Sequence, residues 1–92
     1  MKKEVVMRRT KYSLQSIMED IGHALAELRL RMGYDSIKEF TSDFGLPMIQ
    51  YWRIEKGKAN LTLKSLHRLL AIHKIGIGEF FCYLNKWDTK NS

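Results

Sequence analysis

The 92-residue chain contains 45% hydrophobic and 28% charged residues, a composition that fits one small globular domain. Its single cysteine, Cys82, excludes an internal disulfide and a zinc site built from several cysteines, as expected for a protein of the reducing cytoplasm. The longest segment without charge spans only residues 44–52, whereas a membrane helix needs roughly 20 apolar residues. We therefore expect neither a membrane span nor a signal peptide.

The formal net charge of +6 is distributed unevenly along the chain. Residues 1–11 carry a net charge of +4, residues 12–46 a net charge of −3, and residues 53–74 a net charge of +5. Basic clusters of this kind suit a polyanion, with a nucleic-acid backbone as the first candidate and an anionic membrane surface as the second. A basic face that contacts only solvent is the alternative.

Residues 1–12 show no sustained periodicity and are predicted to form a flexible basic arm. The apolar residues that follow recur mostly at every third or fourth position, the period of one helical face. They are Leu14, Ile17, Met18, Ile21, Leu25, Leu28 and Met32. This first helix starts at Ser13, or at Ser16 with Glu19 as a capping box, and Gly33 ends it because glycine accepts a positive φ.

A second and a third helix follow with only two residues between them. Ser36 with Glu39 predicts the start of the second helix, and Gly45 predicts its end in a tight turn. Pro47 opens the third helix, predicted over about 47–55, because its fixed φ suits a first helical position. The inward-facing residues and the closing glycine of this helix are Tyr51, Ile54 and Gly57.

Thr62 is the predicted cap of a fourth helix. Its expected buried face consists of Leu63, Leu66, Leu69, Leu70 and His73. A fifth helix, over about 77–84, adds Phe80, Phe81 and Leu84 to the expected core. Because no segment alternates as a strand does, we predict an all-α fold with one domain over residues 13–86 and a C-terminal tail over 87–92.

Only Gly45 and Leu46 separate the second helix from the third, and so short a turn forces a large angle between them, as in a helix-turn-helix. Over residues 21–81 the chain resembles the Xre/Cro-type helix-turn-helix regulators. The residues that carry the resemblance are Leu25, Leu28, Arg29, the Gly-Tyr-Asp-Ser segment 33–36, Phe40, Phe44, Tyr51, the Arg-Ile-Glu-Lys-Gly-Lys segment 53–58, Asn60, Leu63, Leu66 and the Glu-Phe-Phe segment 79–81. The resemblance implies a five-helix, lambda-repressor-like domain.

In proteins of this type the third helix lies in the major groove of DNA. The resemblance assigns base contacts to Met48, Ile49, Gln50 and Arg53, and phosphate contacts to Ser36, Lys56, Lys58 and Asn60. Arg53 can donate two hydrogen bonds to guanine and Gln50 can pair with adenine, whereas methionine and isoleucine can contact only thymine methyl groups. Ordinary solvation is the alternative for the two lysines.

The resemblance also implies a partly buried ion pair between Arg29 and Glu55. A half-buried carboxylate without a cation is costly, and a guanidinium group can satisfy both of its oxygens. Two separate surface charges are the alternative.

The predicted function is sequence-specific binding of double-stranded DNA by a bacterial, cytoplasmic transcription regulator that has no cofactor and no enzymatic activity. A domain of this size covers about half an operator, so we expect a homodimer on a palindromic site, for which Leu14 and Met18 offer a contact. The alternative is a protein-interaction or antitoxin-like module, since Met48, Ile49 and Trp52 make the third helix unusually apolar for a DNA reader.

Four further residues have plainer interpretations. Trp52 is expected at the edge of the core, with the DNA backbone or a protein interface as alternatives. His67 and His73 lie six positions apart, a spacing that does not place two ligands on one side of a helix, so no metal site is predicted. We expect His73 to be half-buried and hydrogen-bonded, and Cys82 to be a small core residue.

Overall fold

The computed structural model describes residues 13–91 of the chain and the side chains of residues 13–85. Its helices are α3 (Leu14–Arg31), α4 (Ile37–Phe44), α5 (Met48–Glu55), α6 (Leu63–Ile72) and α7 (Ile77–Asn91). No strand occurs over this part of the chain, which confirms the predicted all-α class with five helices. The predicted basic arm, residues 1–12, lies outside the described residues.

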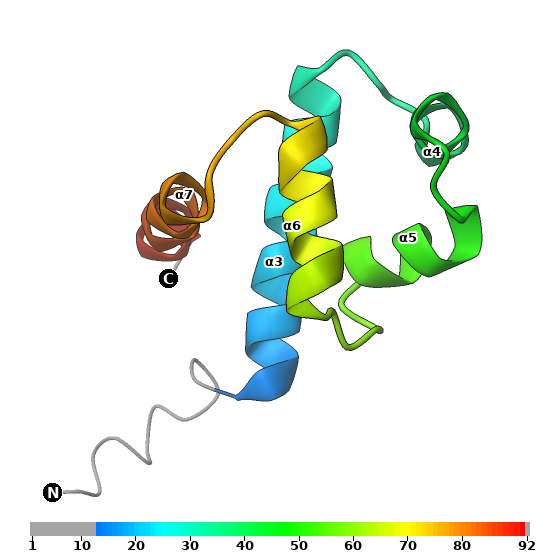
Figure 1. The fold of residues 1–92 in the computed structure, drawn as a ribbon. Coiled ribbons are helices and arrows are strands. Elements are labelled where there is room, and N and C mark those ends of the chain that lie inside the picture. Colours follow the sequence, from blue (N-terminus) through cyan, green and yellow to red (C-terminus); the bar gives the residue numbers. More distant parts are fainter. Residues whose placement is uncertain (1–12, 92) are drawn as a thin grey trace, which may run out of the picture.

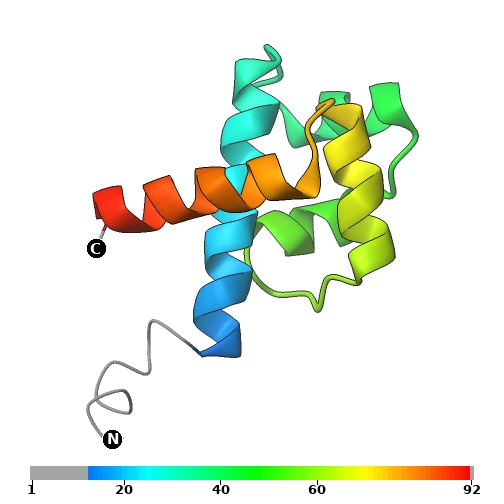
Figure 2. The same ribbon diagram turned by 60° about the vertical axis from the view of Figure 1, so that its left-hand side comes forward.

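Helix α3 is the axis around which the other helices are arranged. It packs against α5 and against α7, and α5 also packs against α4. Figure 1 shows α4 and α5 on one side of α3 and α7 on the other. In Figure 2, α7 crosses the middle of α3, and the first turns of α3 extend beyond this crossing. The arrangement leaves α4 and α5 together on the side away from α7.

Side-chain caps fix the starts of three helices. Ser13, Ser36 and Thr62 each accept a hydrogen bond from the backbone N–H three residues later, which confirms the predicted caps of α4 and α6. Of the two predicted starts of α3, the structure has the earlier one. Pro47 precedes the first residue of α5, Met48, and supplies no side-chain cap.

Glycines with a positive φ follow three helices at the predicted positions, Gly33, Gly45 and Gly57. Helix α6 ends differently, because Lys74 adopts a φ of 58° after its last turn. A side chain in this left-handed region brings Cβ close to the following carbonyl oxygen, so Lys74 is a strained position.

Helix α7 is longer than the sequence predicted. The predicted helix ends at about Leu84, but α7 continues to Asn91, and Trp87, three positions after Leu84, continues the apolar period in the sequence. Residues 79–92 contain neither glycine nor proline, so nothing in the backbone stops the helix earlier.

The core forms around the ring of Phe40 in α4. The ring centroids of Tyr34, Phe44, Tyr51 and His73 lie 5.1–5.7 Å from it. Buried apolar residues come from all five helices, and they are Ala24, Leu25, Phe40, Tyr51, Leu66, Leu69, Leu70 and Phe80. These residues hold α4 and α5 at a fixed angle to each other and to α3.

Three side chains that the sequence placed in the core are exposed. Leu63 is 70% exposed, Phe81 is 51% exposed, and Cys82 is exposed as well. Phe80 occupies the buried position of α7, and since successive helix positions are about 100° apart, the two residues after it turn toward solvent. Leu63 lines an open hollow between α6 and the start of α7, near Ile77, where no other helix of the described residues covers it.

The apolar stripe of α3 is only partly buried. Leu25 is fully buried and Ile21 packs against the core, but Leu14, Ile17 and Met32 are exposed. The first turns of α3 extend past the crossing with α7 (Figure 2), so no other helix of the described residues covers Leu14 and Ile17, whereas Met32 is exposed at the opposite end of α3.

His73, at the end of α6, is half-buried as predicted. Its ring stacks on Phe40 with 14° between the ring planes. The expected hydrogen bond is absent at Nε2, which is buried and has no partner. Burial lowers the pKa of His73, and the negative charge of Glu55 opposes this shift.

The lowered pKa of His73 predicts a loss of stability in mild acid. The folded state prefers the neutral imidazole, so the free energy of unfolding should fall as the pH drops below the ordinary histidine pKa of 6.5. Urea unfolding between about pH 8 and pH 5 measures this fall, and His73→Leu should reduce it. An equal pH dependence in both proteins would refute the assignment to His73.

The strain at Lys74 predicts that Lys74→Gly stabilises the protein by about 0.5–1 kcal/mol, as relief of the left-handed strain exceeds the greater unfolded-state entropy of glycine. Thermal and urea unfolding measure the difference. Lys74→Ala is the matched control, because it removes the same charge but keeps Cβ. Equal stabilisation by both substitutions would assign the effect to the charge.

Candidate nucleic-acid interface

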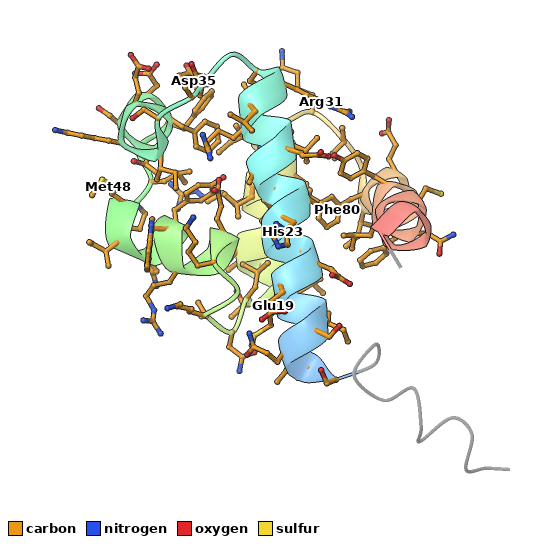
Figure 3. All side chains as sticks on the ribbon, turned by 180° about the vertical axis from the view of Figure 1, so that it is seen from behind. Glu19, His23, Arg31, Asp35, Met48 and Phe80 are labelled. Carbon is orange, nitrogen blue, oxygen red and sulfur yellow. The ribbon has the colours of Figure 1, made fainter. Side chains whose placement is uncertain are left out.

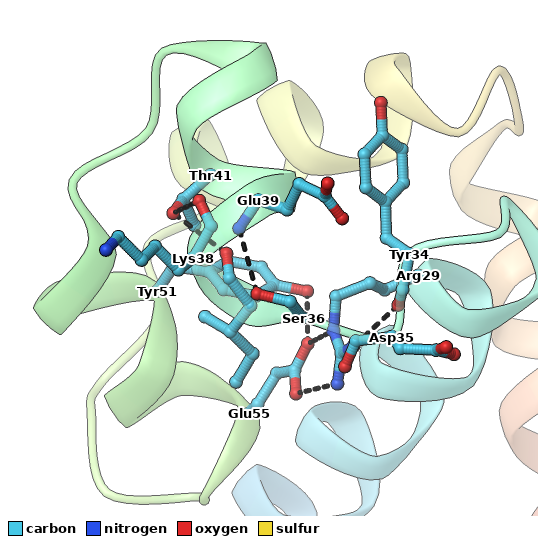
Figure 4. Close-up of polar contacts among 10 residues, drawn as sticks. Arg29, Tyr34, Asp35, Ser36, Lys38, Glu39, Thr41, Tyr51 and Glu55 are labelled. Atoms are coloured by element: carbon cyan, nitrogen blue, oxygen red, sulfur yellow. Dashed lines mark hydrogen bonds and ion pairs between the residues drawn. The ribbon is translucent and has the colours of Figure 1, made fainter.

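A bidentate ion pair joins α3 to the end of α5 (Figure 4). Arg29 Nε donates to Glu55 Oε2 at 2.8 Å, and Arg29 Nη2 donates to Glu55 Oε1 at 3.1 Å. Tyr51 donates its hydroxyl to the same Oε2 at 2.5 Å, so the carboxylate has three donors. Both charged side chains are buried, and the predicted pair is therefore present in its buried form. The hydrogen bond to Glu55 raises the pKa of Arg29, and burial raises the pKa of Tyr51.

The same guanidinium group also fixes the chain that enters α4. Arg29 Nη1 donates to the carbonyl oxygens of Tyr34 at 2.8 Å and Asp35 at 3.0 Å. These residues lie directly before the cap of α4, Ser36, whose Oγ accepts from the backbone of Glu39. One side chain thus sets the position of both helices that form the candidate interface.

Helices α3 and α5 approach each other closely at Gly22. A Cβ atom at this position would lie 2.4 Å from the carbonyl oxygen of Glu55 and 2.6 Å from that of Ile54. Only glycine permits this contact, which brings the end of α5 within reach of the guanidinium of Arg29.

The outer face of α5 is open to solvent. Gln50 and Arg53 are both exposed, while Tyr51 is buried on the opposite side of the helix. The apolar residues Met48 and Ile49 are 41% and 67% exposed. Figure 3 shows Met48 at the outer end of α5, away from α3. All four residues predicted to contact bases therefore lie on a helix face that the described part of the chain leaves uncovered.

A cationic cluster, here called the basic edge, adjoins this face and consists of Arg53, Lys56 and Lys58. Arg53 Nη2 donates to the carbonyl oxygen of Lys58 at 2.8 Å. The Nζ atoms of Lys56 and Lys58 lie 5.9 and 5.8 Å from the ring centroid of Trp52. Trp52 is 40% exposed and attracts both ammonium groups through its negative ring face, so its ring gathers the two like charges in one place.

The remaining phosphate candidates lie apart from one another. Asn60 is exposed and borders, with Gln50 and Arg68, a cavity of about 170 Å³ between α5 and the start of α6. Ser36 lies at the start of α4, and Figure 1 shows α4 and the loop after α5 on different sides of α5. The structure therefore brings Asn60 close to Gln50 on α5 and leaves Ser36 on the other flank of α5.

The exposed surface of α4 carries acidic groups that flank Ser36. Asp35 and Glu39 are exposed, and Asp43 accepts a hydrogen bond from the hydroxyl of Tyr34 at 2.7 Å. That hydrogen bond raises the pKa of Tyr34. The candidate interface is thus electrostatically polarised, with positive charge at the end of α5 and negative charge on α4.

Two contacts that the sequence analysis missed hold the two ends of α5. Arg68 of α6 donates to the carbonyl oxygen of Gly45 in the turn before α5, at 3.3 Å. Gln15 of α3 donates to the carbonyl oxygen of Gly57 in the loop after α5, at 3.0 Å. No sequence pattern indicates either contact, because the partners lie 23 and 42 residues apart and the acceptors are backbone atoms.

Comparisons with known proteins find no similar protein. A scan against protein-family models finds no match, and searches of curated proteins and of solved structures find no significant match. Among the described residues, no helix is long and apolar enough to cross a membrane. The same residues include no group of three or more histidine, cysteine, aspartate or glutamate side chains placed to hold a metal ion.

The ion pair predicts a large effect of a neutral substitution at Arg29. Arg29→Met leaves the buried carboxylate of Glu55 without its cation, which should cost about 3–5 kcal/mol of unfolding free energy. Chemical unfolding monitored by circular dichroism measures this loss. The double variant Arg29→Met with Glu55→Leu should recover part of it, since it removes the unpaired charge. A single variant as stable as the wild type would contradict the structural role of the pair.

Proposed function

We propose that the chain is a sequence-specific DNA-binding transcription regulator of the Xre/Cro type, with a lambda-repressor-like domain and α5 as its recognition helix. The observation that carries the proposal is the uncovered face of α5, on which Gln50 and Arg53 lie beside Lys56 and Lys58. The proposed setting is the bacterial cytoplasm, and binding needs no cofactor.

The chemistry of the α5 face suits the edges of base pairs in the major groove, which is wide enough to admit a helix. Arg53 uses one N–H of Nη2 for the carbonyl of Lys58, and a guanidinium group has five N–H donors, so donors remain for guanine. Gln50 carries both an acceptor and donors for adenine. The exposed side chains of Met48 and Ile49 suit thymine methyl groups, which favours sites that contain A·T pairs.

The basic edge suits the phosphate backbone beside the groove. Lys56 and Lys58 converge on one aromatic ring before any ligand is present, so less side-chain freedom is lost when they bind phosphate. At the start of α4, the carboxylates of Asp35 and Glu39 flank Ser36 and oppose the attraction of an anion by Lys38 and by the helix N-terminus. We therefore place the main phosphate contacts at the basic edge and only a minor one at Ser36.

A single α5 reaches few base pairs, so tight and specific binding requires two copies. We propose a homodimer on a palindromic site whose half-sites lie about 34 Å apart, one turn of the DNA helix. Leu14 and Met18, the residues suggested by the sequence, offer one contact for the second copy: Leu14 is exposed, Met18 is partly buried, and exposed Ile17 adjoins them.

The second candidate function is a protein-interaction or antitoxin-like module. The observation that favours it is the exposure of three large apolar side chains, Met48, Ile49 and Trp52, on one short helix. Exposed apolar surface of this kind marks protein interfaces as well as sites for thymine methyl groups.

Selection of duplexes from a random pool, followed by titration of the selected duplex against salt, separates the two candidates. If about six phosphates are neutralised, the logarithm of the binding constant should fall with the logarithm of salt concentration with a slope of about −5. Weak binding without a preferred sequence would contradict the DNA proposal and favour the protein-interaction module.

Three substitutions test which residues of the proposed interface contact bases and which contact phosphates. Gln50→Ala should relax specificity at one base pair by about 1–3 kcal/mol and leave the salt slope unchanged. Lys58→Ala should weaken all duplexes equally and reduce the slope by about 1. Arg53→Ala should relax specificity at one base pair and also reduce the salt slope, because Arg53 also donates to the carbonyl of Lys58.

Lys74→Ala removes one positive charge at the far end of α6 and is the matched control for Lys58→Ala. Equal effects of these two lysine substitutions would show that net charge alone, and not the basic edge, drives binding.

A further inference from the structure

In the loop after α5, the N–H groups and the carbonyl groups of Gly57 and Lys58 all form hydrogen bonds. The N–H of Gly57 donates to the carbonyl of Ile54 at 3.1 Å, and the N–H of Lys58 donates to that of Arg53 at 2.8 Å. These two bonds form the Schellman motif that closes α5. The carbonyl of Lys58 accepts from Arg53, and the carbonyl of Gly57 accepts from Gln15.

Of these four bonds, only the one from Gln15 reaches the loop from another helix. Gln15 lies in the first turn of α3, before the part of the chain that resembles the Xre/Cro-type regulators. Its Nε2 donates to Gly57 O at 3.0 Å and to Glu19 Oε2 at 3.0 Å. One amide group, with its two N–H donors, therefore connects α3 to the loop after α5.

The loop is also in direct contact with the backbone of α3. A Cβ atom at Gly57 would lie 2.8 Å from Cγ of Glu19 and 3.0 Å from its Cα. Gly57 is buried at this contact and has a φ of 69°, so the loop has one well-defined position against α3. The position of Gly57 therefore determines the positions of its neighbours, Lys56 and Lys58.

We infer that Gln15 is a positioning residue for phosphate binding, an inference that rests on the proposed DNA-binding function. Gln15 does not touch the phosphate. Its hydrogen bond fixes Gly57, and Gly57 places Lys56 and Lys58 beside Trp52 before DNA arrives. Without this bond the loop has more freedom to lose on binding, which weakens every duplex but does not alter the base-reading face of α5.

The test compares Gln15→Ala with the wild type on the selected duplex and on a scrambled duplex over a range of salt concentrations. Gln15→Ala should bind both duplexes about three- to tenfold more weakly, with an unchanged affinity ratio between them and a less steep salt slope. Hydrogen exchange without DNA should show faster exchange at the amides of Gly57 and Lys58 in the variant.

A rescue variant separates positioning from a general structural role. Gln15→Lys supplies an ammonium group that can donate to both Glu19 and Gly57, so it should restore the affinity and the amide protection. Leu30→Lys, added to Gln15→Ala, is its control, because it adds the same charge at an exposed position of α3 that lies too far along the helix to reach Gly57. Equal gains from the two lysines would overturn the inference in favour of net charge.

The remaining outcomes separate the inference from the function on which it rests. If the wild type binds DNA and Gln15→Ala binds it equally well, the role of Gln15 is overturned and the proposed function stands. The same holds if Gln15→Ala lowers the free energy of unfolding but leaves the affinity of the folded protein unchanged. Absence of DNA binding by the wild-type chain would overturn the proposed function and the inference together.

Discussion

The position of the candidate interface depends on the buried guanidinium group of Arg29. Its four hydrogen bonds go to the carboxylate of Glu55 at the end of α5 and to the backbone that leads into α4. A buried charge is tolerated only when its partners satisfy it, and here those partners belong to the two helices that must be held at a fixed angle. The absence of a side chain at Gly22 lets the two oppositely charged groups meet.

Once α5 is held in this way, its two sides have different roles. Tyr51 belongs to the core and also donates to Glu55, so the inner side of α5 contributes to packing and to the ion pair. No other helix of the described residues covers the outer side, where Arg53 and Trp52 contact only the segment that follows α5, and its exposed side chains remain available to a ligand. The loop that follows is basic, while α4 and the residue before its cap carry Asp35, Glu39 and Asp43 against Lys38, which favours a polyanion approaching from the end of α5.

Local rules predicted the helix boundaries well, because a cap or a stop depends on a few neighbouring residues. Ser36, Thr62 and Gly45 have the expected roles since a hydroxyl group three residues before an N–H, or a glycine after a helix, acts through the backbone next to it. Periodicity was less reliable for burial. Phe81 and Leu63 have the right spacing for a buried face, but burial also requires a neighbouring helix, and spacing does not reveal where that helix ends.

The sequence by itself determined the all-α class, the five helices except the end of α7, the caps of α4 and α6, and the inward position of Tyr51 on α5, because these follow from composition, period and local hydrogen bonding. The resemblance it carries added the pairing of Arg29 with Glu55. Only the tertiary structure decided that Trp52 gathers two lysines, that Cys82 is exposed, and that Gln15 holds the loop after α5. The physical reasons differ: Gln15 and Gly57 are 42 residues apart and the acceptor is a backbone atom, the exposure of Cys82 depends on where the neighbouring helices lie, and Lys58 reaches the ring of Trp52 only because the loop after α5 folds back on the helix.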